Sequence, residues 1–162
     1  MKIYEMGRLI SFPIMPAFMG VVRADLKGLI KNLSLVNPKV LDVGGRKSPY
    51  TIGLPIDLTL LDIPRETEVQ EKLNLGVTES GLLRLRESRS NISNLILEDM
   101  TETTLPDKSF DAVICVEVIE HVPNDTQFVK NIHKVLRKGG WAYFTTPNGD
   151  YIKNEPPNFN PD

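Results

Sequence analysis

The stretch KVLDVGG, residues 39–45, decides the fold. An apolar run that ends in two glycines is typical of a buried strand followed directly by a tight turn. Four more short runs of the same kind follow along the chain, and each predicts a strand. They are LTLLD (58–62), LIL (95–97), AVICV (112–116) and WAYFT (141–145).

Helical patterns alternate with these strands. Apolar residues spaced along one helical face precede the first strand, at positions 22, 26, 29, 30 and 33, and residues 79–88 have helical character. Asn124 or Asp125 caps a further helix, which we expect to run on until Gly139 stops it. Alternating strands and helices predict an α/β fold with a parallel sheet, whose ligands bind beyond the carboxyl ends of the strands.

Composition narrows the class of protein. The chain has 162 residues, 41% of them hydrophobic and 25% charged, which fits one globular domain. A net charge of -2 counts against nucleic acid as a partner. Cys115 lies in an apolar run and is expected to be a buried core residue in a reducing compartment. The apolar segment 9–22 contains Pro13 and Pro16 and is too short for a membrane span, so we expect an N-terminal arm packed on a cytoplasmic protein with no membrane contact.

Acidic residues end three successive strands. Asp42 precedes the Gly44-Gly45 turn, Asp62 lies 18 positions after Gly44, and Asp99 follows the third strand. An acidic residue about 20 positions beyond a glycine-rich turn can accept both hydroxyls of a ribose. Each carboxylate alone could be an ordinary solvated strand end, but the ordered series indicates a nucleoside site.

The chain resembles the class I S-adenosylmethionine-dependent methyltransferases, and among them the small-molecule enzymes similar to ubiquinone-biosynthesis O-methyltransferases. The resemblance rests on VLDVGG (40–45), LLDI (60–63), LEDM (97–100), SFDAVICVEVIEHVPN (109–124) and LRKGGWAYFTTPN (136–148). It implies a Rossmann-like parallel sheet of order 3-2-1-4-5 with helices on both faces. It also implies that the cofactor is S-adenosylmethionine.

The resemblance assigns roles at the first two strand ends. Asp42 with the turn of Gly44 and Gly45 would hold the methionine end of the cofactor. Asp62 would bind the ribose hydroxyls.

Further roles follow at the third and fourth strands. Asp99 and the backbone of Met100 would hold the adenine, while Val116 and Glu117 would pass behind the sulfonium. His121 is the expected general base, because imidazole exchanges protons most readily near neutral pH.

The chain departs from the family pattern in three places. Arg46 and Ser48 stand where the family usually has glycines, so Arg46 either points away or pairs with the cofactor carboxylate. The first crossover, residues 49–57, leaves room for about one helical turn. The last two family strands are missing before Asp162, so the chain is either a fragment or a naturally short form.

This pattern predicts three regions: an N-terminal arm and helix (1–38), a cofactor-binding core (39–148) and a polar tail (149–162) that is an incomplete acceptor region. The predicted function is methyl transfer to an oxygen, nitrogen or carbon of a small molecule. One alternative is an enzyme similar to small-RNA 2'-O-methyltransferases, with a metal at Glu117, Glu120 and His121; we favour the interpretation without a metal. Another is a degenerate domain without catalysis. A nicotinamide-dependent dehydrogenase would need glycines at Arg46 and Ser48.

Overall fold

The computed structural model describes residues 2–11, 16–72 and 76–148. Its five strands form one parallel sheet in the order β3-β2-β1-β4-β5. The strands are β1 (Lys39–Val43), β2 (Asp57–Asp62), β3 (Ile92–Leu97), β4 (Phe110–Val116) and β5 (Leu136–Thr145). The expected fold class and strand order are confirmed.

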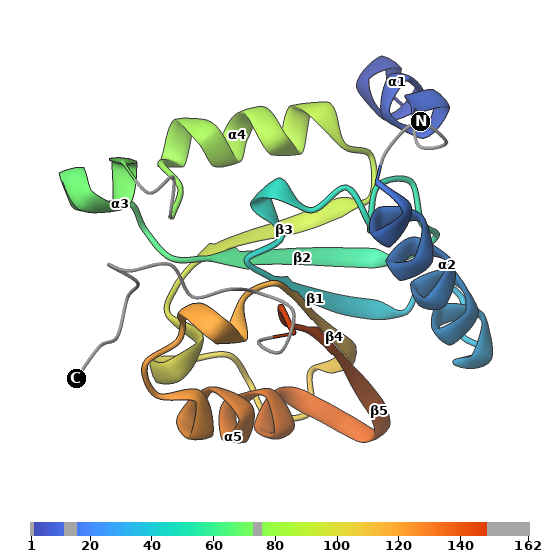
Figure 1. The fold of residues 1–162 in the computed structure, drawn as a ribbon. Helices are drawn as coiled ribbons and strands as arrows, with labels where there is room; N and C mark the ends of the chain where they lie inside the picture. Colours follow the sequence, from blue (N-terminus) through green and yellow to red (C-terminus); the bar gives the residue numbers. More distant parts are fainter. Residues whose placement is uncertain (1, 12–15, 73–75, 149–162) are drawn as a thin grey trace.

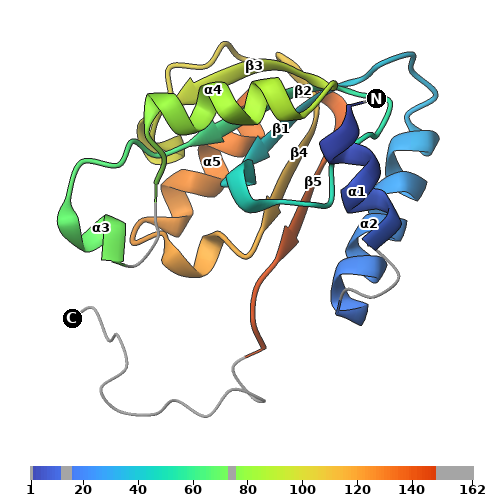
Figure 2. The ribbon, with the colours of Figure 1, turned by 90° about the horizontal axis from the view of Figure 1, so that it is seen from above.

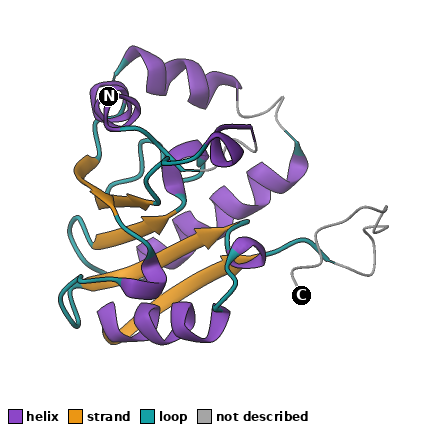
Figure 3. Cartoon of the chain, turned by 90° about the vertical axis from the view of Figure 1, so that its left-hand side faces the viewer, coloured by secondary structure: helices purple, strands orange, loops and turns teal. Residues whose placement is uncertain are grey.

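Helices cover both faces of the sheet (Figure 3). They are α1 (Ile3–Ser11), α2 (Ala17–Asn32), α3 (Glu68–Lys72), α4 (Glu79–Ser88) and α5 (Asp125–Val135). In the described part of the chain, short 3-10 turns follow β1, β3 and β4: they are η2 (Gly45–Lys47), η3 (Met100–Glu102) and η4 (Ile119–His121). Figure 1 shows α4 and α5 on opposite sides of the sheet.

Alternate strand residues build two hydrophobic cores. On one face Val40, Leu58 and Ile114 pack against the buried side of α2. On the other face Val113 and Cys115 pack against α5. The central strands are therefore apolar on both sides, as their sequences predict, and Cys115 is buried as expected.

The first crossover is as short as predicted. One 3-10 turn leaves β1, and the chain returns to β2 through turns at residues 50–53 with no full helix. Tyr50, Ile52, Leu54 and Ile56 are buried along this return. Tyr50, Leu54 and Ile56 belong to the same hydrophobic core as α2, so this return packs on the sheet without a crossover helix.

The N-terminal region is more helical than expected. It contains α1 in addition to α2, and α1 contacts α4 (Figure 2). Glu5 anchors α1 to the domain by accepting hydrogen bonds from the backbone and hydroxyl of Ser90, at 2.8 and 3.0 Å. Among the described residues, no helix is both long and apolar enough to cross a bilayer.

The predicted end of the last helix is wrong. We expected α5 to continue to Gly139, but it ends at Val135 and Leu136 already belongs to β5. Leu136 pairs with Phe110 of β4, and Arg137 forms an ion pair with Asp111 at 2.8 Å. These non-local contacts override the local helical pattern. The predicted polar tail, residues 149–162, lies outside the described residues.

Candidate active site

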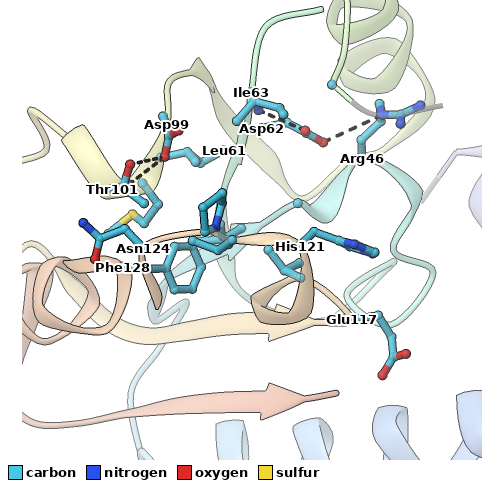
Figure 4. Close-up of a pocket in the computed structure, with 17 residues that line it drawn as sticks. Arg46, Leu61, Asp62, Ile63, Asp99, Thr101, Glu117, His121, Asn124 and Phe128 are labelled. Atoms are coloured by element: carbon cyan, nitrogen blue, oxygen red, sulfur yellow. Dashed lines mark hydrogen bonds and ion pairs between the residues drawn. The ribbon is translucent and has the colours of Figure 1, made fainter. Parts of the chain in front are cut away.

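A cavity of about 440 Å³ opens at the carboxyl ends of β1, β2 and β4 (Figure 4). This is where ligands of open parallel sheets bind, and its volume is in the range of small-molecule sites. Its lining combines a few charged groups with an apolar floor. The lining residues are Val43, Gly44, Arg46, Leu61, Asp62, Ile63, Gly76, Asp99, Met100, Thr101, Glu117, Val118, His121, Val122, Pro123, Asn124 and Phe128.

The glycine turn needs both of its glycines. Gly44 has a φ of 68°, and a Cβ there would stand 2.7 Å from Cγ2 of Val118. A Cβ on Gly45 would stand 2.4 Å from Cγ of Asp42. The turn therefore lies directly on the Asp42 carboxylate, and its backbone faces the cavity at Gly44.

Asp42 belongs to a buried polar network beneath the turn. Thr51 donates a hydrogen bond from its hydroxyl to Asp42 at 2.9 Å and accepts one from the guanidinium of Arg89 at 2.6 Å. Burial raises the pKa of Asp42 to about 6, although the charge of Arg89 and the Thr51 hydrogen bond act in the opposite direction. The carboxylate therefore supports the turn from below and does not line the cavity.

Gly45→Ala is expected to lower the free energy of unfolding by about 1–3 kcal/mol, because the new methyl group overlaps the buried carboxylate. Gly28→Ala is the matched control. Gly28 lies within α2, and a Cβ added there would meet no neighbouring atom within 4 Å, so alanine should stabilise the protein by about 0.5–1 kcal/mol. Denaturant unfolding measures both changes. Equal effects of the two substitutions would contradict the packing of the turn on Asp42.

Asp62 lies at the end of β2 and lines the cavity. Its Oδ1 accepts a hydrogen bond from the backbone of Ile63 at 3.0 Å. Its Oδ2 lies 3.7 Å from Nε of Arg46, and both side chains are largely buried (Figure 4). The carboxylate is therefore in position to meet a ligand, but a guanidinium already pairs with it.

The residues that follow β3 form another part of the cavity wall. Asp99 caps η3 by accepting hydrogen bonds from the backbone and hydroxyl of Thr101, at 2.7 and 2.8 Å. Met100 is buried beside it. Asn131 of α5 donates hydrogen bonds to the carbonyls of Met100 and Thr101, both at 2.8 Å, and so fixes η3 to the helix. Sequence reasoning did not find Asn131, whose partners lie about 30 residues away.

The end of β4 is held by its neighbouring strand. Glu117 has a φ of 55°, a conformation that non-glycine residues adopt at a cost in energy. Its backbone amide donates to the carbonyl of Thr145 at 3.1 Å, and the Thr145 hydroxyl donates to its carboxylate at 2.9 Å. Figure 4 shows that carboxylate set apart from Asp62 and Asp99.

His121 is exposed at the end of η4 and lines the cavity. Glu117 also lines it, whereas Glu120 does not. Within the described residues, no group of three or more histidine, cysteine, aspartate or glutamate side chains could hold a metal ion.

The structure brings together six of the nine residues predicted for the site. Lining the cavity are Gly44, Asp62, Asp99, Met100, Glu117 and His121, whereas Asp42, Gly45 and Val116 are not among its lining residues. Apart from Met100, the apolar part of the lining was not predicted. It includes Leu61, Val118 and Phe128, which read in the sequence as ordinary core positions.

Comparisons with known proteins agree with this geometry. A family model described as a methyltransferase domain matches residues 57–144. The ubiquinone biosynthesis O-methyltransferase of Rickettsia akari is 41% identical over 117 residues, which cover 72% of this chain and 43% of that protein. The enzyme of the same name from Coxiella burnetii is 24% identical over 136 residues, or 78% of this chain and 50% of that protein. The chain thus spans about half the length of these relatives.

Solved structures share the fold. A protein of Pyrococcus horikoshii OT3 matches with a TM-score of 0.51 and 26% identity, covering 72% of this chain and 53% of that one. The methyltransferase CalH, in complex with SAH, matches with a TM-score of 0.52 and 14% identity, covering 75% of this chain and 35% of that one. The sheet order, the cavity at the strand ends and the family match together show that the chain belongs to the methyltransferase domain family, in the class I S-adenosylmethionine-dependent group.

Proposed function

We propose that the chain binds S-adenosylmethionine in the cavity at the strand ends and takes part in methyl transfer to a small molecule. The observation that carries this proposal is the arrangement of Gly44, Asp62 and Asp99 around one cavity. A glycine backbone, a carboxylate at the second strand end and another at the third are what a nucleoside with an amino-acid tail requires.

The cavity fits such a cofactor in shape and charge. A side chain at Gly44 would strike Val118, so only a bare backbone lets a ligand approach this turn closely. Leu61, Met100 and Phe128 give an apolar surface for a flat base. The described lining holds the carboxylates of Asp62, Asp99 and Glu117 against one guanidinium, which favours a ligand that carries a positive sulfonium.

In this proposal, the residues of the chain contribute to the reaction rate mainly by positioning the cofactor and the acceptor. The bound cofactor supplies an activated methyl group, so alignment with the acceptor accounts for much of the rate. The β4 end, fixed by Thr145 at Glu117, forms one side of the path between cofactor and acceptor.

We further propose that the acceptor is a hydroxyl-bearing small molecule, as the name of the O-methyltransferase relatives suggests. His121, exposed at the cavity mouth, would remove the hydroxyl proton as general base.

Asp62→Ala is expected to weaken binding of S-adenosylhomocysteine, the demethylated cofactor, by tenfold or more. Two hydrogen bonds to a charged group are lost, each worth about 1.5–3 kcal/mol. Asp57→Ala is the control, because Asp57 begins the same strand at the opposite end and is not among the cavity residues. Calorimetric titration measures both affinities. An unchanged affinity in Asp62→Ala would remove Asp62 from the site, and no binding to the unmodified chain would refute the proposed function.

A further inference from the structure

Arg46 occupies an unusual place in the cavity. It belongs to η2, directly after the glycine turn, and its side chain is only 18% exposed. Its Nε lies 3.7 Å from the Asp62 carboxylate, the group to which the proposed function gives the ribose hydroxyls. Figure 4 shows the two side chains directed toward each other.

If Asp62 binds the ribose hydroxyls as proposed, its ion pair with Arg46 competes with that contact. A carboxylate that accepts two ribose hydroxyls has less of its charge to share with a neighbouring guanidinium. Burial lowers the pKa of Arg46, the charge of Asp62 acts in the opposite direction, and the charge of Arg65 adds a smaller lowering. A largely buried guanidinium is destabilised when Asp62 turns to another partner, because the loss of a counter-charge is unfavourable away from water.

We propose that Arg46 determines which ligands the cavity accepts: it pairs with Asp62 in the free protein and with the carboxylate of the ligand's amino-acid tail in the complex. The inference rests on the proposed function and deepens it. A nucleoside that brings its own carboxylate replaces the partner that Arg46 gives up. A nucleoside without a carboxylate binds Asp62 but offers Arg46 no negative charge in exchange.

The position of Arg46 suits this exchange. Gly44 and Gly45 immediately precede it, and the backbone of Gly44 faces the cavity. An arginine reaches several ångströms from its Cα on a flexible stem, and its planar fork matches a carboxylate with two parallel hydrogen bonds. The same side chain can therefore serve Asp62 or a ligand carboxylate without movement of the turn.

Two related ligands separate the parts of the proposal. S-adenosylhomocysteine carries the amino-acid tail, whereas 5'-methylthioadenosine keeps adenine, ribose and sulfur but lacks that tail. Calorimetry gives the affinity of each ligand for the unmodified chain and for Arg46→Gln. We expect Arg46→Gln to weaken S-adenosylhomocysteine by about tenfold or more and to tighten 5'-methylthioadenosine by about threefold.

Matched variants control for charge and folding. Arg84→Ala removes an exposed cation from α4 that is not among the lining residues, and should change neither affinity. Arg46→Lys keeps the charge without the planar fork and should bind S-adenosylhomocysteine with intermediate affinity. Thermal melting confirms that each variant is folded. If Arg46→Gln does not fold, the two affinities are compared between the unmodified chain and Arg46→Lys.

Three results would overturn the inference. If Arg46→Gln binds both ligands more tightly to the same extent, Arg46 only obstructs Asp62. If it binds both more weakly to the same extent, Arg46 only supports the fold. If neither affinity changes, Arg46 takes no part in binding. If the unmodified chain binds neither ligand, the proposed function fails first, which distinguishes that failure from these three.

Discussion

Arg89→Ala is expected to lower the free energy of unfolding by about 3–5 kcal/mol at pH 7, because it leaves the buried carboxylate of Asp42 without its counter-charge. Arg89 is itself only 2% exposed and donates to the hydroxyl of Thr51 and the carbonyl of Ser48. Loss of the Arg89 side chain therefore removes both the charge and two hydrogen bonds that tie the end of α4 to the first crossover.

The destabilisation should depend on pH. Burial already holds the folded pKa of Asp42 near 6, above its ordinary value of 3.8, and loss of the Arg89 charge would raise it further. A carboxyl group with a raised folded pKa binds its proton first in the folded state, so the fold gains stability as the pH falls. The loss of stability caused by Arg89→Ala should therefore grow as the pH rises above 6, and should fall to a smaller, constant value below pH 6, where Asp42 is protonated in both folded proteins.

Urea unfolding of Arg89→Ala at pH 4, 5, 6 and 7 measures this dependence. Arg86→Ala is a suitable control, because Arg86 is an exposed cation near the end of the preceding helix α4. Arg89→Met keeps much of the volume and separates charge from packing. A loss of stability that is small, or that is the same at every pH, would contradict the proposed coupling between Arg89 and Asp42.

His121→Ala is expected to lower the turnover number for a hydroxyl acceptor by about a hundredfold or more, the usual contribution of a general base. The affinity for S-adenosylhomocysteine should stay within about twofold, because His121 lies on the exposed rim rather than among the nucleoside-facing carboxylates. The substitution should therefore separate chemistry from cofactor binding.

His133→Ala supplies the matched control for this substitution. His133 is the second of the two histidines and lies exposed on α5. Added imidazole should restore part of the turnover of His121→Ala and have no effect on the control. Exhaustive chelation before each assay tests the metal alternative. Full turnover in His121→Ala would exclude the base, and loss of turnover on chelation would favour a metal-assisted route.

The strands could be predicted from the sequence because the local pattern agrees with the tertiary environment. Residues 112–116 are apolar at every position, and the strand they form is covered on both faces. The glycine turn and the acidic strand ends could be found because they follow one another in order at the ends of successive predicted strands.

Contacts between distant residues could not be predicted in this way. Arg89 and Asp42 are 47 positions apart, and nothing local marks an arginine that will be buried. The start of β5 depends on pairing with Phe110 of β4, and the spacing of apolar residues along the chain carries no information about such pairing. In α1 the apolar residues Ile3 and Ile10 are exposed while Glu5 is buried, so hydrophobic periodicity indicates the wrong face.

An amide NMR titration with S-adenosylhomocysteine tests the central claim most directly, because it reports both whether the ligand binds and where. We expect the amide signals of Gly44, Asp62 and Met100 to shift together as the cavity fills. Signals from Lys27 and Gly53, in the separate groove beside α2, should stay in place. Unchanged spectra at saturating ligand, or shifts confined to that groove, would contradict the assignment of the cofactor site to the strand ends.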